Sequence, residues 1–451
     1  MSASESELPQ HLRGNGAPVQ EEQTLTELEV RGTIPPELDG RYLRNGANPV
    51  TGMSDHPFLG DGMIHGVRLR DGRAEWYRNR YVQTPFLADT SKQVVDVAGT
   101  MMDMTASKAN THVVGHAGKI LALEEGHFPY VLDGELNTVG PTDFGGKLKV
   151  PFTAHPKICP ITGEMLAFGY FFAEPYMTYH RVSADGEMVQ SEPITVGGPT
   201  MVHDFNVTEN HVVFMDLPAC FDLQLAMKGE MPIAWKEDYP SRLGVMPRDG
   251  HDSDVVWYDV DPCYVFHPMN SYEDGDRIVL DVARFDHIWR DGPMDFPDPV
   301  LWRWVIDRKS GKVAEEQVDD RPGEFPRVRD SVIGRKHRFG YLTGFPDEVG
   351  QADMSKAAGA LLKYDRESGS RSAIELGRGC IPGEAVFVAG AGGSDEDDGY
   401  LMTYVYDAAS NTSEFVIFDA ATMSKEPVAS VQLPRVPFGF HGSWVDASVA
   451  D

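Results

Sequence analysis

A short phrase that recurs along the chain limits its possible folds more than any other feature. In each copy a strand-like run ends in Asp, a turn containing Gly or Ser follows, and a run of alternating polar and apolar residues begins. The copies are VLDGELN, RVSADGEM, VIDRKSGK, KYDRESGS and IFDAATMS. An Asp at such a turn accepts hydrogen bonds from nearby backbone N–H groups. The phrase therefore predicts a series of β-hairpins, and the 45 Gly and 31 Pro provide the many turns that these need.

Hairpins repeated over most of a 451-residue chain favour an all-β fold with radial repetition, because that arrangement leaves few sheet edges exposed. We predict that residues 25–451 form a single β-propeller domain and that residues 1–24 form a flexible N-terminal arm. A stack of β-sandwich domains is the alternative that the hairpin pattern leaves open.

Two longer stretches, residues 219–250 and 285–300, interrupt the hairpin pattern and contain apolar residues in exposed-looking settings. Insertions on one face of a propeller commonly cover a site. We predict that these stretches cap one, and ordinary irregular loops are the alternative interpretation.

The charge of the chain excludes several classes of partner. The formal net charge of −29 repels phosphates and anionic membrane surfaces, so nucleic-acid binding is not expected. The four cysteines are widely spaced, which suggests neither a disulfide framework nor a zinc ribbon. The first residues lack the basic and apolar regions of a signal peptide, and no run of about 18 apolar residues occurs. These features predict a soluble cytoplasmic protein.

Common catalytic signatures are also absent, including HExxH, GxSxG, the P-loop and the H-x-D/E start of a facial-triad iron site. Four of the fifteen histidines share another setting, in TAHP, MVHDF, VFHP and GFHGSW. These are His155, His203, His267 and His441, and each ends an apolar, strand-like run. The innermost strands of propeller blades converge on one axis, so the four side chains could meet there. A buried histidine is also often a hydrogen-bonded core residue, and the residues alone leave both interpretations open.

The same four contexts, in this order, resemble the four-histidine iron site of the carotenoid cleavage oxygenase family. The similarity covers nearly the whole chain. GTIPPELDGRYLRNGANPV resembles the N-terminal signature of the family, and FLGDGMIHGVRLRDGRAEWYRNRYVQTP resembles its first blade. ANTHVVGHAGKILALEEG, CYVFHPMNSYEDGDRIVLDVARFD, GEFPRV, PGEAVFV and FGFHGSW match in order.

The resemblance implies a seven-bladed propeller with one Fe(II) on its axis, beneath a cap of loops and short helices. It implies that His155, His203, His267 and His441 bind the iron and that Glu125, Glu324 and Glu384 lie behind them. Carboxylates that accept the far N–H of each ring would fix its tautomer and offset the charge of the metal. Three acids cannot serve four histidines, and the resemblance leaves His155 unsupported, beside an open coordination position shaped by Thr111.

The implied activity is oxidative cleavage of a C=C bond to two carbonyl products, with O2 as co-substrate. The stilbene-cleaving type resembles a pattern with Lys just before the first of these acids and a Tyr upstream. Here that position is Glu124, and residues 85–110 contain no Tyr. A carboxylate cannot help to ionise a phenol, so we expect a carotenoid or apocarotenoid, with a stilbene-like alkene as the alternative.

Two further alternatives are a propeller that only binds ligands and an enzyme that isomerises its substrate. Many carotenoid-cleaving relatives carry a long apolar insertion that enters membranes. Here residues 219–250 are short and charged, and we expect at most peripheral membrane contact through a patch at Phe221, Leu223, Leu225 and Met227.

Overall fold

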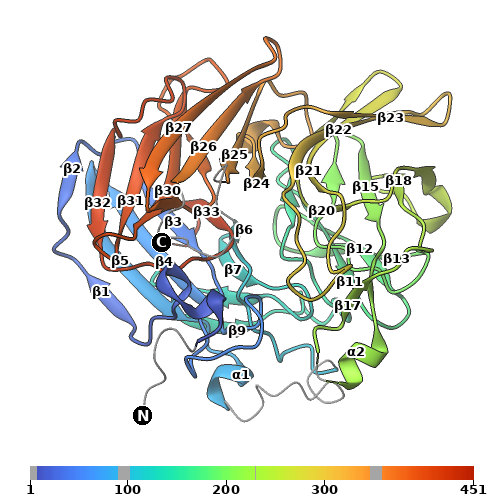
Figure 1. Cartoon of the computed structure of the whole chain (residues 1–451), viewed down its shortest axis with the longest axis horizontal. Helices are drawn as coiled ribbons and strands as arrows, with labels where there is room; N and C mark the ends of the chain where they lie inside the picture. The colour runs from blue at the N-terminus through green and yellow to red at the C-terminus, as the bar shows by residue number, and fades with distance from the viewer. Residues whose placement is uncertain (1–7, 90–101, 229, 346–357, 451) are drawn as a thin grey trace.

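The computed structural model describes residues 8–89, 102–228, 230–345 and 358–450. It is an all-β protein in which seven sheets surround one axis, as Figure 1 shows. The prediction of a seven-bladed β-propeller is confirmed, and the β-sandwich alternative is wrong.

Each blade is an antiparallel sheet, and in five of the seven blades the strands follow one another in chain order from the axis to the rim. Three blades have four consecutive strands each. They are β6 (His112–His116), β7 (Lys119–Leu123), β8 (Tyr130–Leu132) and β9 (Thr138–Pro141); β10 (Lys157–Ile158), β11 (Met165–Tyr170), β12 (Met177–Val182) and β13 (Met188–Ile194); and β20 (Tyr264–Asp274), β21 (Arg277–Phe285), β22 (Val300–Asp307) and β23 (Lys312–Gln317).

Two more blades also have four strands, and one of them carries an insertion. They are β14 (Asn206–Val207), β15 (His211–Asp216), β18 (Arg242–Pro247) and β19 (Val256–Asp259); and β24 (Gly323–Arg327), β25 (Phe339–Gly344), β26 (Ala358–Asp365) and β27 (Ser370–Arg378). Between β15 and β18 the chain forms a separate hairpin of β16 (Ala219–Phe221) and β17 (Ile233–Trp235), with the short helix α2 (Leu223–Met227) at its tip.

The remaining two blades combine strands from both ends of the chain. One contains β1 (Gln23–Leu25), β3 (Gly40–Arg44), β4 (Met63–Arg70), β5 (Arg73–Tyr81) and β33 (Gly442–Asp446). The other contains β2 (Val30–Gly32), β28 (Cys380–Pro382), β29 (Val386–Ala389), β30 (Gly399–Asp407), β31 (Thr412–Asp419) and β32 (Ala429–Leu433). Strand β33 pairs with β3, so a C-terminal strand is innermost in a blade that begins the propeller. This pairing closes the ring.

The remaining helices are short. Among the described residues they are α1 (Pro85–Ala88), which Thr84 caps, and the 3₁₀ helices at Gln10–Leu12, Gly14–Gly16, Asp252–Asp254 and Asp330–Val332.

The structure describes most of the segment that was predicted to be a flexible N-terminal arm. Residues 1–7 lie outside the described residues, but residues 8–24 pack on the propeller. Leu12 is buried, the Val19 N–H donates to Asn48 Oδ1 at 2.8 Å, and β1 pairs with the outer strand β5. The assignment of residues 25–451 to one separate catalytic domain stays a prediction.

The turns of the recurring phrase form as expected. Asp133, Asp307 and Asp365 each accept hydrogen bonds from backbone N–H groups two to four residues ahead. In RVSADGEM the turn is held instead by Ser183, whose hydroxyl accepts from the Glu187 N–H. A short side chain that ends the strand can close the turn in either case.

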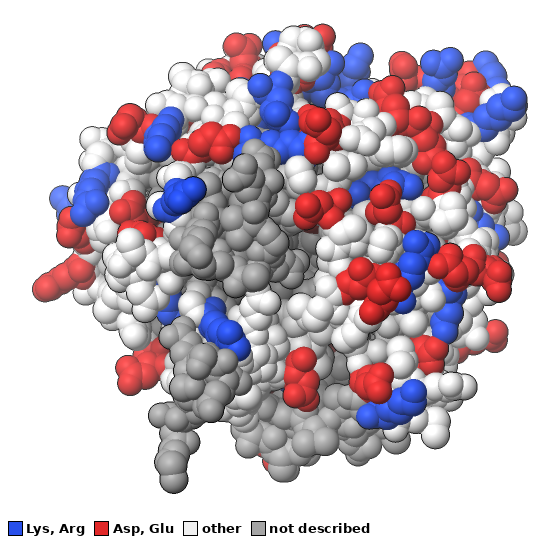
Figure 2. Space-filling model, in the orientation of Figure 1, with Lys and Arg blue, Asp and Glu red and all other residues white. Residues whose placement is uncertain are grey.

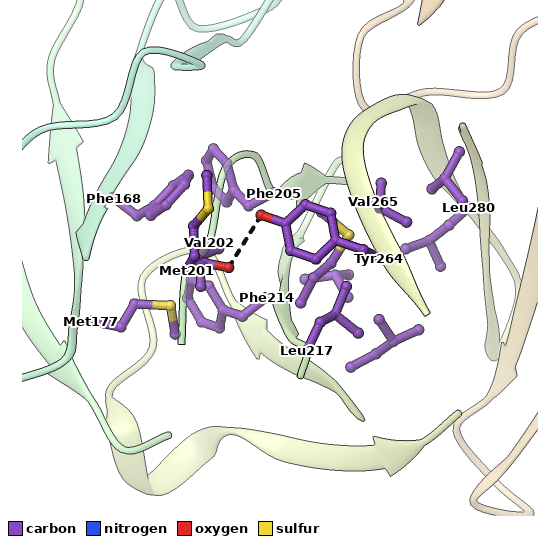
Figure 3. Packing of buried hydrophobic residues seen from close by; sticks show 14 of the residues in the cluster. Phe168, Met177, Met201, Val202, Phe205, Phe214, Leu217, Tyr264, Val265 and Leu280 are labelled. Carbon is purple, nitrogen blue, oxygen red and sulfur yellow. Dashed lines mark hydrogen bonds between the residues drawn. The ribbon is translucent and has the colours of Figure 1, made fainter. Parts of the chain in front are cut away.

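The core lies between neighbouring blades. Its largest cluster joins the blades that begin with β10, β14 and β20, and Figure 3 shows part of it. The ring of Phe168 in β11 packs edge-on against the ring of Phe205, with 5.0 Å between the ring centroids. The buried Tyr264 donates a hydrogen bond to the Met201 carbonyl at 3.3 Å, which is the dashed line in Figure 3. This packing fixes the two segments that carry His203 and His267.

The surface seen in Figure 2 carries acidic and basic side chains interspersed, with many acidic ones. In the described part of the chain no helix is long and apolar enough to cross a membrane.

Candidate metal centre

Four histidines from four different blades meet on the propeller axis. His155, His203 and His441 lie just ahead of the innermost strands β10, β14 and β33, and His267 lies within β20. The Nε2 atoms of His155 and His203 are 3.0 Å apart, as are those of His203 and His267. One ring nitrogen from each of the four lies within 4.8 Å of the other three. The structure therefore brings together the four histidines that the sequence singles out.

Three carboxylates stand behind three of these rings. His267 Nδ1 donates to Glu324 Oε2 at 2.6 Å, and His441 Nδ1 donates to Glu384 Oε1 at 3.1 Å. His203 Nδ1 lies against Glu125 Oε1 in an ion-pair contact. All three acids were predicted by resemblance, and each contacts a different histidine. With Nδ1 directed at a carboxylate, Nε2 is the atom that faces the axis.

His155 has a different environment. Its Nδ1 is 3.7 Å from Asp204 Oδ2, which is too long for a hydrogen bond. The Asp204 carboxylate instead accepts from Lys157 Nζ at 2.8 Å and from the Phe205 N–H at 2.6 Å. An ion pair between the partly buried Lys157 and the buried Asp204 therefore lies behind His155, in place of the direct carboxylate partner that the other three rings have.

The protonation of three of the four rings favours a cation at the centre. Burial and the neighbouring imidazoles hold the pKa values of His155 and His441 well below the usual value, and burial lowers the pKa of His267 to about 3. Burial also acts on His203, but the Glu125 carboxylate outweighs it and raises the pKa of that ring. A neutral ring that donates from Nδ1 carries a lone pair on Nε2. Converging lone pairs repel one another unless a cation lies between them.

The donor spacing and one orphaned atom fit the same cation. Two imidazole nitrogens that each lie about 2.1 Å from a metal, at a right angle, are about 3.0 Å apart, which matches the observed separations. Burial raises the pKa of Glu324 to about 8, and its Oε1 has no hydrogen-bond partner. A bound divalent cation would stabilise this buried carboxylate as an anion. The residues present fit a metal with imidazole ligands, such as Fe(II).

Thr111 lies next to the ring but makes no contact that defines a coordination position. Its carbonyl accepts a hydrogen bond from the His441 N–H at 3.1 Å, and its hydroxyl donates to Asn110 Oδ1 at 3.0 Å. The role suggested for Thr111 at an open position stays a prediction.

The two sides of the ring differ in chemistry. On one side, the ring of Phe266 lies 5.1 Å from His203, and Phe325 lies 5.5 Å from His267 and 5.2 Å from His441. On the other side is a cavity of about 300 Å³, whose lining mixes apolar residues with the polar and charged side chains of Lys157, Asp204, Asn270, Arg327 and Glu384.

The two predicted insertions meet near the aromatic side. The Trp235 N–H of the β16–β17 hairpin donates to the Trp289 carbonyl at 3.4 Å. Trp289 and Phe296 in turn pack on Phe266, with ring centroids 6.1 and 6.2 Å away. Residues 285–300 thus cover the aromatic side of the ring, as a cap does.

Sequence reasoning missed several residues of this site. His112 lies 5.2 Å from His441 between ring centroids and directs Nδ1 at the Ala154 carbonyl, so it faces away from the centre. Lys157 follows His155 by two residues, the spacing that places side chains on one face of a strand. The sequence could therefore have indicated that Lys157 lies near the site. No sequence pattern marks Tyr170, which contacts Glu125, because this contact forms only when the blades pack together.

A second group of potential ligands, His287, Asp291 and Asp295, also occurs. It belongs to one partly exposed loop, and Asp295 Oδ2 already accepts from the Arg290 and Asp291 N–H groups. Its three residues come from one loop, whereas the four axial histidines come from four separate blades.

Several known proteins are similar to this chain in sequence. The family model of the retinal pigment epithelial membrane protein (RPE65) matches residues 16–446. A carotenoid cleavage oxygenase of Mycobacterium tuberculosis is 39% identical and aligns over 98% of both chains. A carotenoid 9,10(9',10')-cleavage dioxygenase 1 of Pisum sativum is 36% identical, over 98% of this chain and 91% of that protein.

Solved structures are similar over nearly their whole length. A lignostilbene dioxygenase of Pseudomonas brassicacearum superposes with a TM-score of 0.88 at 28% identity, covering 97% of this chain and 99% of that one. A Synechocystis apocarotenoid oxygenase mutant gives 0.84 at 26% identity, covering 95% and 97%. With the family model spanning the propeller and the four-histidine ring in place, the chain belongs to the RPE65 family of carotenoid cleavage oxygenases, which are non-haem iron dioxygenases.

Proposed function

We propose that this protein is an Fe(II)-dependent dioxygenase that cleaves a C=C bond of a carotenoid or apocarotenoid to two carbonyl products, with O2 as co-substrate. The observation that carries the proposal is the ring of four imidazoles, three of which have a carboxylate behind them. His155, His203, His267 and His441 would hold one iron per chain.

Iron in such a ligand set supplies the activation of O2. The described residues of the chain have other tasks. Glu125, Glu324 and Glu384 fix the orientation of three ligand rings. Phe266 and Phe325 give the centre an apolar wall against which an alkene can lie. Residues 285–300 cover that wall and limit the access of water.

The environment of Glu124 favours a polyene over a phenolic stilbene. Burial raises the pKa of Glu124, but His127 outweighs it and lowers the pKa. The carboxylate contacts His127 Nδ1 and accepts from the Gly126 N–H at 2.9 Å. An anion that already has these partners is poorly suited to bind a phenolate. The two relatives of known sequence described above are also carotenoid-cleaving enzymes by name.

A stilbene-like substrate is the second candidate. The observation in its favour is the TM-score of 0.88 with a lignostilbene dioxygenase, against 0.84 with the apocarotenoid oxygenase mutant.

Peripheral membrane contact would give access to an apolar substrate. Leu223 and Met227 of α2 are 67% and 80% exposed, and Phe221, two residues before the helix, packs against Tyr170. The patch is small, so we expect weak and reversible binding. A cytoplasmic location stays a prediction.

The proposal is tested by reconstituting the purified protein with Fe(II) without air and then supplying carotenoids, apocarotenoids and stilbenes with ¹⁸O₂. We expect about one iron per chain and two ¹⁸O-labelled carbonyl products from a polyene. Products that are only isomers of the substrate, or a protein that takes up no iron, would overturn the proposal.

A further inference from the structure

We propose that Tyr170 is a positioning residue of the metal centre, which acts on His203 through Glu125. The inference rests on the proposed function only in taking the four-histidine ring as a metal site. It concerns a residue that contacts neither a ligand ring nor the axial centre directly.

The two oxygens of Glu125 have separate partners. Oε1 lies against His203 Nδ1, and Oε2 accepts a hydrogen bond from the Tyr170 hydroxyl at 2.5 Å. Tyr170 ends β11, Glu125 follows β7, and His203 precedes β14. The contact therefore joins three successive blades, and the orientation of one ligand ring depends on a hydroxyl in the blade that lies between those of Glu125 and His203 in chain order.

The other two carboxylates are held in another way. Glu324 accepts the N–H of Phe325, which is next to it in sequence. Glu384 Oε2 accepts the N–H of Gly442 at 2.8 Å, directly after its histidine. Backbone donors of this kind cannot be removed by a side-chain substitution. At Glu125 the anchor is a phenol, and its oxygen can be deleted while the ring stays.

The surroundings keep Tyr170 in place. Its ring is buried and packs against Phe221 at 5.9 Å between centroids. Loss of the hydroxyl would leave Glu125 Oε2 in a largely but not fully buried position without this donor. The carboxylate could then rotate toward other partners, and His203 would lose part of the constraint on its orientation and basicity. Partners behind a metal ligand typically change metal affinity by 10- to 100-fold when they are removed. Tyr170 is one contact further out, so we expect about a three- to tenfold effect.

The test uses Co(II) as a probe in the full-length protein, because its d–d absorption reports ligand geometry and needs no turnover. In Tyr170→Phe we expect the dissociation constant for Co(II) to rise by about three- to tenfold, with a changed d–d spectrum. Tyr179→Phe is the matched control. It also removes a buried hydroxyl in the same blade, one that donates to the Arg248 carbonyl at 3.0 Å, and we expect wild-type affinity and spectrum. Circular dichroism compares the folding of both variants.

A double-mutant cycle separates positioning from a general structural effect. If Tyr170 acts through Glu125, adding Tyr170→Phe to Glu125→Ala should change the Co(II) affinity by less than about twofold. An unchanged Co(II) spectrum and affinity in Tyr170→Phe would overturn the inference, as would an effect that persists in full without Glu125. A wild-type protein that binds Co(II) with this dependence but cleaves no alkene would refute the proposed function and leave this inference standing.

Discussion

The two sides of the histidine ring are built from the same inner strands but differ in polarity. Phe266 precedes His267 and Phe325 precedes Arg327, and these rings contact the histidines. Residues further along the same strands, Asn270 and Arg327, are among the polar and charged residues that line the cavity. Because the inner strands run in one direction along the axis, residues before a histidine reach one side and residues after it reach the other. The difference shows how strand direction helps a propeller to place aromatic rings on one side of a metal centre and a cavity with charged side chains on the other.

The largest effect is expected where the two sides meet, at the ring itself. His267→Ala should abolish stoichiometric iron binding and turnover, because it removes a ligand and leaves Glu324 without its partner. Metal analysis of the reconstituted protein measures this. His116→Ala is the control, since His116 is also buried but directs its ring at the Gly163 carbonyl. Retained turnover in His267→Ala would refute the ligand assignment.

On the polar side, Lys157→Met should destabilise the protein by about 2–3 kcal/mol, because it leaves a buried carboxylate unpaired beside His155. The side chains of Lys157 and Asp204 are 20% and 2% exposed. In the exposed pair of Lys147 and Glu187 these values are 52% and 72%. Lys147→Met should therefore cost less than about 0.5 kcal/mol. Urea unfolding measures both, and equal losses would contradict the importance of burial here.

On the aromatic side, Phe325→Ala should lower kcat/KM for the polyene by about tenfold while iron content is kept, because loss of apolar contacts in a pocket costs about 1–3 kcal/mol. Phe144→Ala is the matched control. Both residues have a positive φ, 55° and 51°, but the ring of Phe144 packs on Phe152 instead of a histidine. A loss of iron in Phe325→Ala would show that the Phe325 side chain also holds the histidine ligands in place.

The smallest effect is expected at the far, polar end of β20. Burial raises the pKa of Glu273, but hydrogen bonds from Thr208, His211 and Asn210 outweigh it and lower the pKa to about 2. The native state thus binds this proton less tightly than the unfolded chain. The stabilisation of the folded protein by the charged Glu273 carboxylate is present in full above about pH 4.5 and is lost as the pH falls toward 2. The group is partly exposed, so we expect about 1–2 kcal/mol.

Urea unfolding of the wild type and Glu273→Gln at pH 6 and pH 3 tests this expectation. The stability difference between the two proteins should shrink at pH 3. A difference that stays constant with pH would show that Glu273 contributes through packing rather than through its charge.

The hairpins of this fold could be predicted from short stretches of the sequence. Their turns are capped by residues close in sequence, such as Asp307, which accepts from the N–H groups of Lys309 and Ser310. The number of blades had no such local origin and came from the resemblance. In the same way, His267 could be found from its setting at the end of an apolar run. Tyr170 could not, because its contact with Glu125 arises only when blades pack.

The closure of the propeller by β33 has a consequence for biosynthesis. His441 lies one residue before β33, and the Asn45 N–H beside β3 donates to its carbonyl at 3.0 Å. A nascent chain that has emerged only as far as residue 440 would contain three of the four histidines, and the blade of β3 would still lack its innermost strand. The last ligand and the last strand therefore arrive together. Tight uptake of metal would then report that ring closure has taken place, and incompletely folded chains would be poor competitors for iron.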